Sequence, residues 1–172
     1  MSARRPIVLP ALLLAAALAT GCAHAPPAAT SVALRQPLPG LYTAGQPAAS
    51  DWQAIKARGV GTVINLRTHE ELKDRDEAAE VRAAGLRYIE IPVSGADGIN
   101  PANARALHKA LAPAHGGGVL VHCASGNRAG ALLALEQREF DGVAAQRALD
   151  IGKAAGVTGL EGKLRQALGI AK

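Results

Sequence analysis

The stretch that decides the fold is Gly118–Arg128, which reads GVLVHCASGNR. Its first half is a short apolar run, typical of a buried strand, and the apolar residues Ala129–Leu135 then begin a helical pattern. This order predicts Cys123 at the carboxyl end of a strand, under the amino terminus of a helix. Backbone N–H groups converge at such a position, so it binds anions and favours a reactive thiolate. Arg128 adds a planar fork that matches an oxyanion in two-pronged fashion.

Strands and helices alternate along the chain, which predicts an α/β fold with a central, mainly parallel sheet flanked by helices. The β-branched and apolar runs predict a short edge strand at residues 41–43 and further strands at 62–66, 86–93 and 119–122. The helical patterns predict helices at residues 51–58, 72–84, 101–111, 129–140, 143–154 and 160–168, with Ser50 as the N-cap of the first.

Three polar segments each follow a predicted strand: residues 65–67, 94–100 and 123–128. Ligands of parallel sheets bind outside the carboxyl ends of the strands, so we expect these segments to share one edge. Arg67 either adds positive charge beside a bound anion or pairs with Glu70 or Glu71, and the ion pair is favoured. The mixed charges of residues 70–80 predict a solvated helix face.

The chemistry follows from the thiolate, which can attack phosphorus and form a cysteinyl-phosphate that water then hydrolyses. His122 is expected to point away from the substrate and to bond the loop. Asp97, in a glycine-flanked loop, is the candidate general acid, and the alternative is a turn residue that bonds its own backbone. The predicted site comprises Cys123 and Arg128, the substrate-binding loop residues Ala124, Ser125, Gly126 and Asn127, and Asp97 and Arg67.

The amino terminus predicts export. Residues 1–21 combine a basic start with an apolar run and small residues, which is typical of a signal peptide. The ending Leu18–Cys22 resembles a bacterial lipobox, in which Cys22 is acylated; ordinary cleavage near Ala25 is the alternative. Residues 22–39, rich in Ala and Pro, predict a tether, and residues 40–172 the folded domain. We therefore expect a membrane-anchored lipoprotein that faces the periplasm.

Charge and cysteine content exclude several functions. The net charge of +5 falls to +3 without the two arginines of the signal, and the remaining basic residues are scattered, so no nucleic-acid partner is expected. Two cysteines and five scattered histidines give no zinc spacing, and no metal or cofactor is expected. With Cys22 acylated, Cys123 is the only thiol of the mature domain.

Four motifs occur in order: YTAGQP at 42–47, GTVINLR at 61–67, IPV at 91–93 and HCASGNR at 122–128. Together they resemble the beta-lactamase hydrolase-like, phosphatase-like domain family, within the cysteine-dependent tyrosine and dual-specificity phosphatases. The resemblance implies a cysteine-phosphatase-like fold, with Cys123 as nucleophile and Arg128 as the phosphate-binding arginine. Asp97 falls where the superfamily often carries its acid. A phosphorylated protein or small molecule is the implied substrate.

Two departures keep other functions open. Four residues separate Cys123 from Arg128, where most phosphatases have five, and the shorter loop also resembles that of rhodanese sulfurtransferases. Ala129 stands where phosphatases usually have Ser or Thr, with Ser125 as the alternative hydroxyl. The leading hypothesis is a hydrolase of phosphate monoesters. The alternatives are a sulfurtransferase that acts through a Cys123 persulfide, and a non-catalytic phosphate-binding module.

Overall fold

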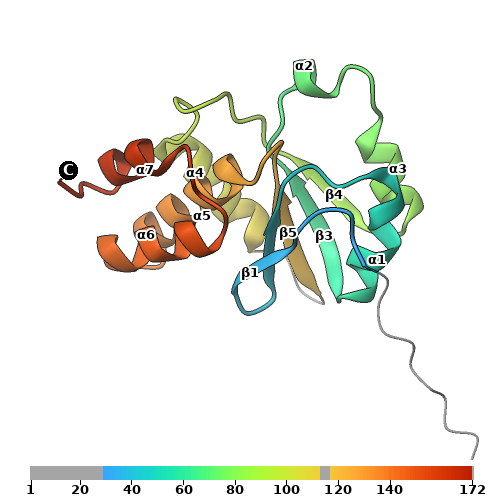
Figure 1. The fold of residues 1–172 in the computed structure, drawn as a ribbon, viewed down its shortest axis with the longest axis horizontal. Coiled ribbons are helices and arrows are strands. Elements are labelled where there is room, and N and C mark those ends of the chain that lie inside the picture. Colours follow the sequence, from blue (N-terminus) through green and yellow to red (C-terminus); the bar gives the residue numbers. More distant parts are fainter. Residues whose placement is uncertain (1–28, 113–116, 172) are drawn as a thin grey trace, which may run out of the picture.

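The computed structural model describes residues 29–112 and 117–171 as a five-stranded sheet with helices on both faces (Figure 1). The strand order is β1-β2-β5-β3-β4. The strands are β1 (Arg35–Leu38), β2 (Leu41–Ala44), β3 (Val60–Asn65), β4 (Arg87–Glu90) and β5 (Gly118–His122). The helices are α1 (Trp52–Ala57), α2 (His69–Leu72), α3 (Glu77–Ala83), α4 (Pro101–Leu111), α5 (Asn127–Glu139), α6 (Ala145–Ala154) and α7 (Glu161–Ala167), and a short 3-10 turn, Ala49–Asp51, precedes α1.

The parallel part of the sheet brings four strand ends to one edge. β5 lies in the centre and pairs in parallel with β2 and β3, and β3 pairs in parallel with β4. In this register Ala44 and Asn65 both lie opposite His122, and Asn65 lies opposite Glu90. The polar segments that follow these strands therefore begin at the same level of the sheet, which confirms the predicted α/β fold and its common edge.

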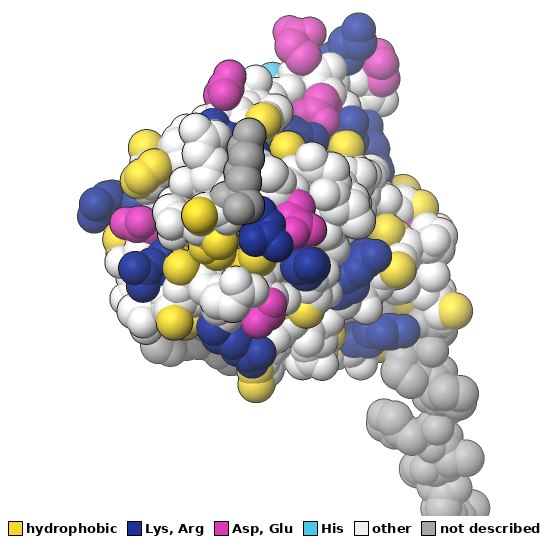
Figure 2. All heavy atoms as spheres, turned by 60° about the vertical axis from the view of Figure 1, so that its left-hand side comes forward, with side chains coloured by type: hydrophobic (Ala, Val, Ile, Leu, Met, Phe, Trp, Pro, Cys, Tyr) yellow, Lys and Arg dark blue, Asp and Glu magenta, His cyan; other side chains and the backbone are white. Residues whose placement is uncertain are grey.

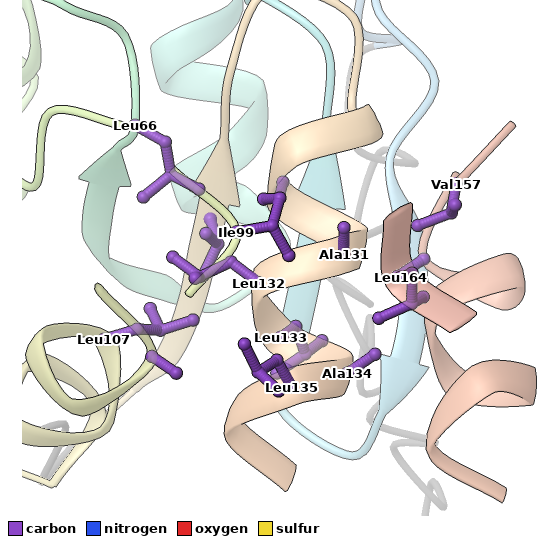
Figure 3. Close-up of a cluster of buried hydrophobic side chains, with 14 of the residues drawn as sticks. Leu66, Ile99, Leu107, Ala131, Leu132, Leu133, Ala134, Leu135, Val157 and Leu164 are labelled. Atoms are coloured by element: carbon purple, nitrogen blue, oxygen red, sulfur yellow. The ribbon is translucent and has the colours of Figure 1, made fainter. Parts of the chain in front are cut away.

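Each face of the sheet carries its own apolar core. Helices α4 to α7 cover one face and α1 and α3 the other (Figure 1). On the first face, buried side chains of α5 such as Leu132 pack with Leu66 and Ile99, which belong to segments at the carboxyl edge (Figure 3). The loops at that edge are thus anchored in the core directly beneath them.

Helix α5 carries the reactive segment at its amino terminus and is held close to α6. A Cβ on Gly130 would lie 2.9 Å from the carbonyl oxygen of Gly152, so the two backbones approach more closely than larger residues allow. The side chain of Thr43 donates to the carbonyl oxygen of Ala155 at 2.8 Å and ties the end of α6 to β2.

Some predicted elements differ from the structure. β1 lies within the stretch predicted as a tether and pairs antiparallel with β2, so part of that stretch belongs to the sheet, and β2 is not an edge strand. Ser50 does not cap α1; the carboxylate of Asp51 receives the backbone N–H groups of Ala48 and Ser31 at 2.9 and 2.8 Å instead.

The helix predicted at 72–84 is shorter in the structure, because α3 begins only at Glu77, and a separate short helix, α2, ends at Leu72. Thr68 and Glu71 form a capping box that begins α2. Asp76 then accepts the N–H of Ala79 at 2.9 Å and begins α3. The chain turns between the two helices, so their carboxylates do not share one solvated face.

Surface and targeting features complete the fold. On the face nearest α6 and α7, basic side chains are interspersed with acidic and apolar ones (Figure 2). Within the described ranges, every helix is too short or too polar to cross a bilayer. The predicted signal and Cys22 lie outside the described residues.

Candidate active site

The segment Cys123–Arg128, here called the Cys123 loop, joins β5 to α5. The Cys123 side chain is fully buried, and its Sγ accepts the backbone N–H of Gly126 at 3.1 Å. Gly126 has a φ of 89°, a left-handed conformation that glycine adopts without strain, and it forms the N-cap of α5. The thiol therefore lies directly under the amino terminus of a 13-residue helix, as the sequence predicts.

The end of β2 fixes this loop from one side. Gly45 forms an isolated bridge with Ser125, and the backbone N–H of Gln46 donates to the carbonyl oxygen of Ala124 at 3.1 Å. A Cβ on Gly45 would lie 3.1 Å from the same oxygen, so a larger residue would push the loop away. This contact gives a structural reason for the YTAGQP motif.

The loop retains free donors. Among the described residues, the backbone N–H groups of Ala124, Ser125, Asn127 and Arg128 donate to no protein acceptor. Asn127 and Arg128 begin α5, where N–H groups have no partner within the helix. These groups, together with the helix dipole, form an anion site next to the sulfur.

Arg128 is held at one end and free at the other. Its Nη1 donates to Glu71 Oε2 and to the carbonyl oxygen of Val93, both at 2.8 Å, and its Nη2 donates to Glu71 Oε1 at 2.6 Å. A guanidinium has five N–H donors, so Nε–H and the second Nη2–H remain, side by side on one edge. The hydrogen bond with Glu71 raises the pKa of Arg128, and the neighbouring Cys123 side chain adds to the rise. The remaining donors suit an oxyanion held against the sulfur.

Glu71 is the partner that orients Arg128. The hydrogen bonds from Arg128 lower the pKa of Glu71 to about 2, in opposition to burial, and Thr68 contributes through the capping box. Glu71 thus stays ionised throughout the neutral and mildly acidic range. The capping box couples the start of α2 to the Cys123 loop.

Arg67 forms the ion pair that the sequence favoured. Its Nε lies 3.6 Å from Glu71 Oε1, and its Nη2 donates to the Glu71 carbonyl oxygen. Nη1 donates to the side-chain oxygen of Gln46 at 2.5 Å. Both Nη atoms of Arg67 therefore bind protein groups, and Arg67 helps to hold Glu71, the partner of Arg128, in place. Direct contact with substrate stays a prediction.

His122 and Glu77 form a buried pair below the loop. His122 Nε2 lies 2.8 Å from Glu77 Oε1, and both side chains are fully buried. Burial alone raises the pKa of Glu77, but the close contact and charge of His122, together with Gln46 and Arg75, bring it below its usual value. The expected bond from His122 to the loop is absent from the described residues, because the imidazole faces Glu77.

Asp97 lies in the segment 94–100, which begins next to Arg128 because Val93 accepts from it. Its side chain is fully exposed, and its Oδ1 is 3.7 Å from Lys163 Nζ. Asn100, not Asp97, caps α4 by accepting the N–H of Asn103 at 3.0 Å. The Asp97 carboxylate makes no bond to its own turn among the described residues, so it remains available as a proton donor. That role stays a prediction.

Of the other predicted loop residues, Asn127 binds protein groups, whereas Ser125 is exposed to solvent. Asn127 uses its side-chain oxygen to accept the N–H groups of Thr158 and Leu160 at 2.8 and 3.2 Å, which holds the loop to the start of α7. Ser125 is exposed, and its Oγ accepts from Asn127 at 3.3 Å. Ala129 is fully buried, so no hydroxyl follows Arg128. The stabilising groups next to the sulfur are therefore the Gly126 N–H and Arg128.

Sequence reasoning missed Glu77 and Gln46, and it named Glu71 only as a possible partner of Arg67, not of Arg128. The Thr68–Glu71 capping box was a signal for a helix start and so for an ordered Glu71. Gln46 lay within a motif already singled out, but nothing in its pattern indicated a partner. No local signal distinguishes Glu77 from the exposed carboxylates around it.

Two other features lie outside the site. A pocket of about 550 Å³ is lined by α2, the turn before α3, the start of α3 including Glu77, and β4, but neither Cys123 nor Arg128 lines it. His108, Glu136 and Asp141 bring ligand atoms within 4.8 Å of one another. His108 Nδ1 already contacts Glu136 at 2.8 Å, and the Gln137 amide donates to both carboxylates, so protein groups satisfy this cluster.

Comparison with known proteins agrees with this geometry. The family model described as "Beta-lactamase hydrolase-like protein, phosphatase-like domain" matches residues 33–139, which include the whole Cys123 loop. The chain belongs to this family. A beta-lactamase hydrolase-like protein of Xylella fastidiosa (strain 9a5c) is 36% identical over 140 residues, which is 74% of this chain and 31% of that protein. The chain thus spans about a third of the length of this curated relative.

Solved structures show the same fold. A candidate phosphatase from Shewanella putrefaciens CN-32 is 28% identical with a TM-score of 0.59, over 78% of this chain and 89% of that one. A cysteine-to-serine variant of P. aeruginosa TpbA in complex with phosphotyrosine is 26% identical with a TM-score of 0.60, over 80% and 81%. The fold of this family member is that of the cysteine-dependent phosphatases, which confirms the resemblance.

Proposed function

We propose that this family member hydrolyses phosphate monoesters through a cysteinyl-phosphate on Cys123. The observation that carries the proposal is the pairing of a buried thiol with two kinds of donors. The Gly126 N–H donates to the sulfur, other N–H groups of the same loop have no protein acceptor among the described residues, and Arg128 presents one free edge near Cys123. This arrangement matches a phosphoryl group whose charge is spread over its outer oxygens.

The reaction has two steps. The Cys123 thiolate attacks phosphorus, an S–P bond forms, and the P–O bond to the alcohol or phenol breaks. The departing oxygen takes a proton, for which Asp97 is the proposed donor. Water then attacks phosphorus and gives its proton back to Asp97, the S–P bond breaks, and inorganic phosphate leaves with the thiolate restored.

A phosphorylated protein side chain, of the tyrosine or dual-specificity type, is the proposed substrate class. The phosphotyrosine complex of TpbA supports a phosphate monoester as ligand. The chain has 2% aromatic residues, so few rings are available to stack on a phenol, which favours a broad substrate range.

The test compares two activities on one protein. p-Nitrophenyl phosphate hydrolysis and sulfur transfer from thiosulfate to cyanide are measured for the wild type and for Cys123→Ser. The proposal expects phosphate release from the wild type that Cys123→Ser abolishes. Sulfur transfer without phosphate release would identify the sulfurtransferase, and phosphate binding without either activity would identify a binding module.

We also propose that the domain is exported and anchored to a membrane by acylation of Cys22. The lipobox-like Leu18–Cys22 supports this. Metabolic labelling with a fatty-acid analogue should label the wild type and not Cys22→Ala. Unlabelled wild-type protein in the soluble periplasmic fraction would favour ordinary cleavage near Ala25.

A further inference from the structure

The buried carboxylate of Glu77 has no place in the reaction steps, yet it is fully enclosed. It lies at the start of α3, and its Oε1 is 2.8 Å from His122 Nε2. The Trp52 ring closes another side of the imidazole, at 6.2 Å between ring centroids. An enclosed carboxylate is unfavourable unless its oxygens are paired, so its retention at this point needs an explanation.

The second carboxylate oxygen has its own partner. The Gln46 side-chain amide donates to Glu77 Oε2 at 2.5 Å. The backbone N–H of the same Gln46 donates to the Ala124 carbonyl oxygen at 3.1 Å. Glu77 therefore reaches the Cys123 loop along two routes, through the residue that precedes Cys123 and through the segment that holds Ala124.

We propose that Glu77 is a positioning residue for Cys123, which acts through His122 and Gln46. In this account it fixes the imidazole on the α3 face of the sheet, directly before Cys123 in the chain, and it fixes the Ala124 carbonyl through Gln46, so that the loop donors converge on one point. The proposal rests on the proposed function only in taking the loop as a phosphate site.

Other titratable groups lie near the pair of Glu77 and His122 and influence its charge. The charge of Arg75, from the turn before α3, acts on Glu77, and Tyr88 of β4 lies close enough to respond to the Glu77 charge. Glu80, one turn further along α3, binds Arg75 and Trp52 instead of the loop. Glu80 therefore offers a matched control on the same helix.

The alternative is a purely structural role, in which the pair only docks α3 on the sheet. The two roles differ in what they predict for Cys123. A structural role affects unfolding alone, whereas a positioning role affects the reactivity of the thiol and the affinity of the loop for an anion in protein that is still folded.

The test measures alkylation of Cys123 by iodoacetamide as a function of pH, with and without inorganic phosphate. The Cys123 peptide is followed by mass spectrometry, which separates it from Cys22. For Glu77→Gln we expect the midpoint of the alkylation profile to rise by about one pH unit, and phosphate protection to weaken about tenfold. Glu80→Gln should leave both unchanged.

The variant His122→Asn tests whether Glu77 acts on Cys123 through His122. In His122→Asn the midpoint should already be raised, and adding Glu77→Gln should not raise it further. Should Glu77→Gln fail to fold, Gln46→Leu cuts the other route at a half-buried position and should weaken phosphate protection severalfold.

Unchanged alkylation and protection in folded Glu77→Gln, or equal changes in Glu80→Gln, would overturn the proposal; so would unchanged protection in Gln46→Leu. Alkylation needs no turnover. A wild type without phosphatase activity would therefore refute the proposed function and leave this result standing.

Discussion

The guanidinium of Arg128 and the carboxylate of Glu71 form a two-pronged ion pair, with N–O distances of 2.6 and 2.8 Å. The two residues are 57 positions apart, and the pair joins the first turn of α5 to the short helix α2. It leaves one edge of the Arg128 guanidinium for a ligand, so the orientation of that edge depends on Glu71.

Glu71→Gln should lower kcat/KM for p-nitrophenyl phosphate by about 10- to 100-fold, because the fork loses its charged anchor. Inorganic phosphate should also inhibit this variant less strongly than the wild type, because in this account Arg128 binds the phosphoryl oxygens throughout the reaction. Glu70→Gln, an exposed neighbour, is the control. Equal kinetics for both variants would show that Arg128 needs no anchor.

The same pair predicts a pH dependence of stability. The pKa of Glu71 is about 2 in the fold, below its ordinary value of 4.5. A lowered pKa means that the pair stabilises the protein above about pH 4.5 and that this contribution disappears as the pH falls towards 2. Glu71 is partly exposed, so we expect Glu71→Gln to cost about 1 to 2 kcal/mol at pH 7. Urea unfolding should show this difference shrinking across that acid range, and a constant difference would contradict the pair's role.

Asp97→Asn tests the general acid through the leaving group. A nitrophenolate can leave without being protonated, whereas an alkoxide needs a proton from the general acid. The variant should therefore lose far more activity on an alkyl phosphate than on p-nitrophenyl phosphate. We expect about a 100-fold loss on the alkyl ester. Steady-state rates at several pH values measure it, with Asp74→Asn as the control. Equal losses on both esters would assign the acid elsewhere.

Gly126→Ala tests the shape of the loop. The φ of 89° is strained for alanine, at about 1 to 2 kcal/mol, so the loop should shift and move the donor N–H from Cys123. Gly142→Ala is the control, because Gly142 also has a positive φ, of 68°, with open space around it. Thermal unfolding should show similar destabilisation of both, and only Gly126→Ala should lose phosphatase activity. Full activity in Gly126→Ala would mean that the loop geometry is not required.

The sheet and its reactive edge were predictable because they depend on local patterns. The apolar run before Cys123 and the helix after it set the thiol at a strand end, and strand alternation set the parallel edge. The position of Arg128 in the first turn of the helix follows from the same short stretch. These features depend only on the local pattern of apolar residues and on the rule that ligands bind at the carboxyl ends of parallel strands.

The supporting charges were not predictable for a physical reason. Glu71 and Glu77 lie in a stretch whose composition resembles a solvated helix face, and the break between α2 and α3 turns both towards the loop. Their partners are Arg128 of α5 and His122 of β5, and only the folded chain brings them together. Burial of Glu77 in particular depends on Gln46, whose role no local pattern indicates.

The central claim is that Cys123 carries the phosphoryl group during turnover. The most direct test is an acid quench of the wild type during p-nitrophenyl phosphate hydrolysis, followed by mass spectrometry of the Cys123 peptide. The account predicts that this peptide gains the mass of one phosphoryl group, and that neither the adduct nor phosphate release occurs with Cys123→Ser. Phosphate release that continues in Cys123→Ser, with no adduct in the wild type, would contradict it.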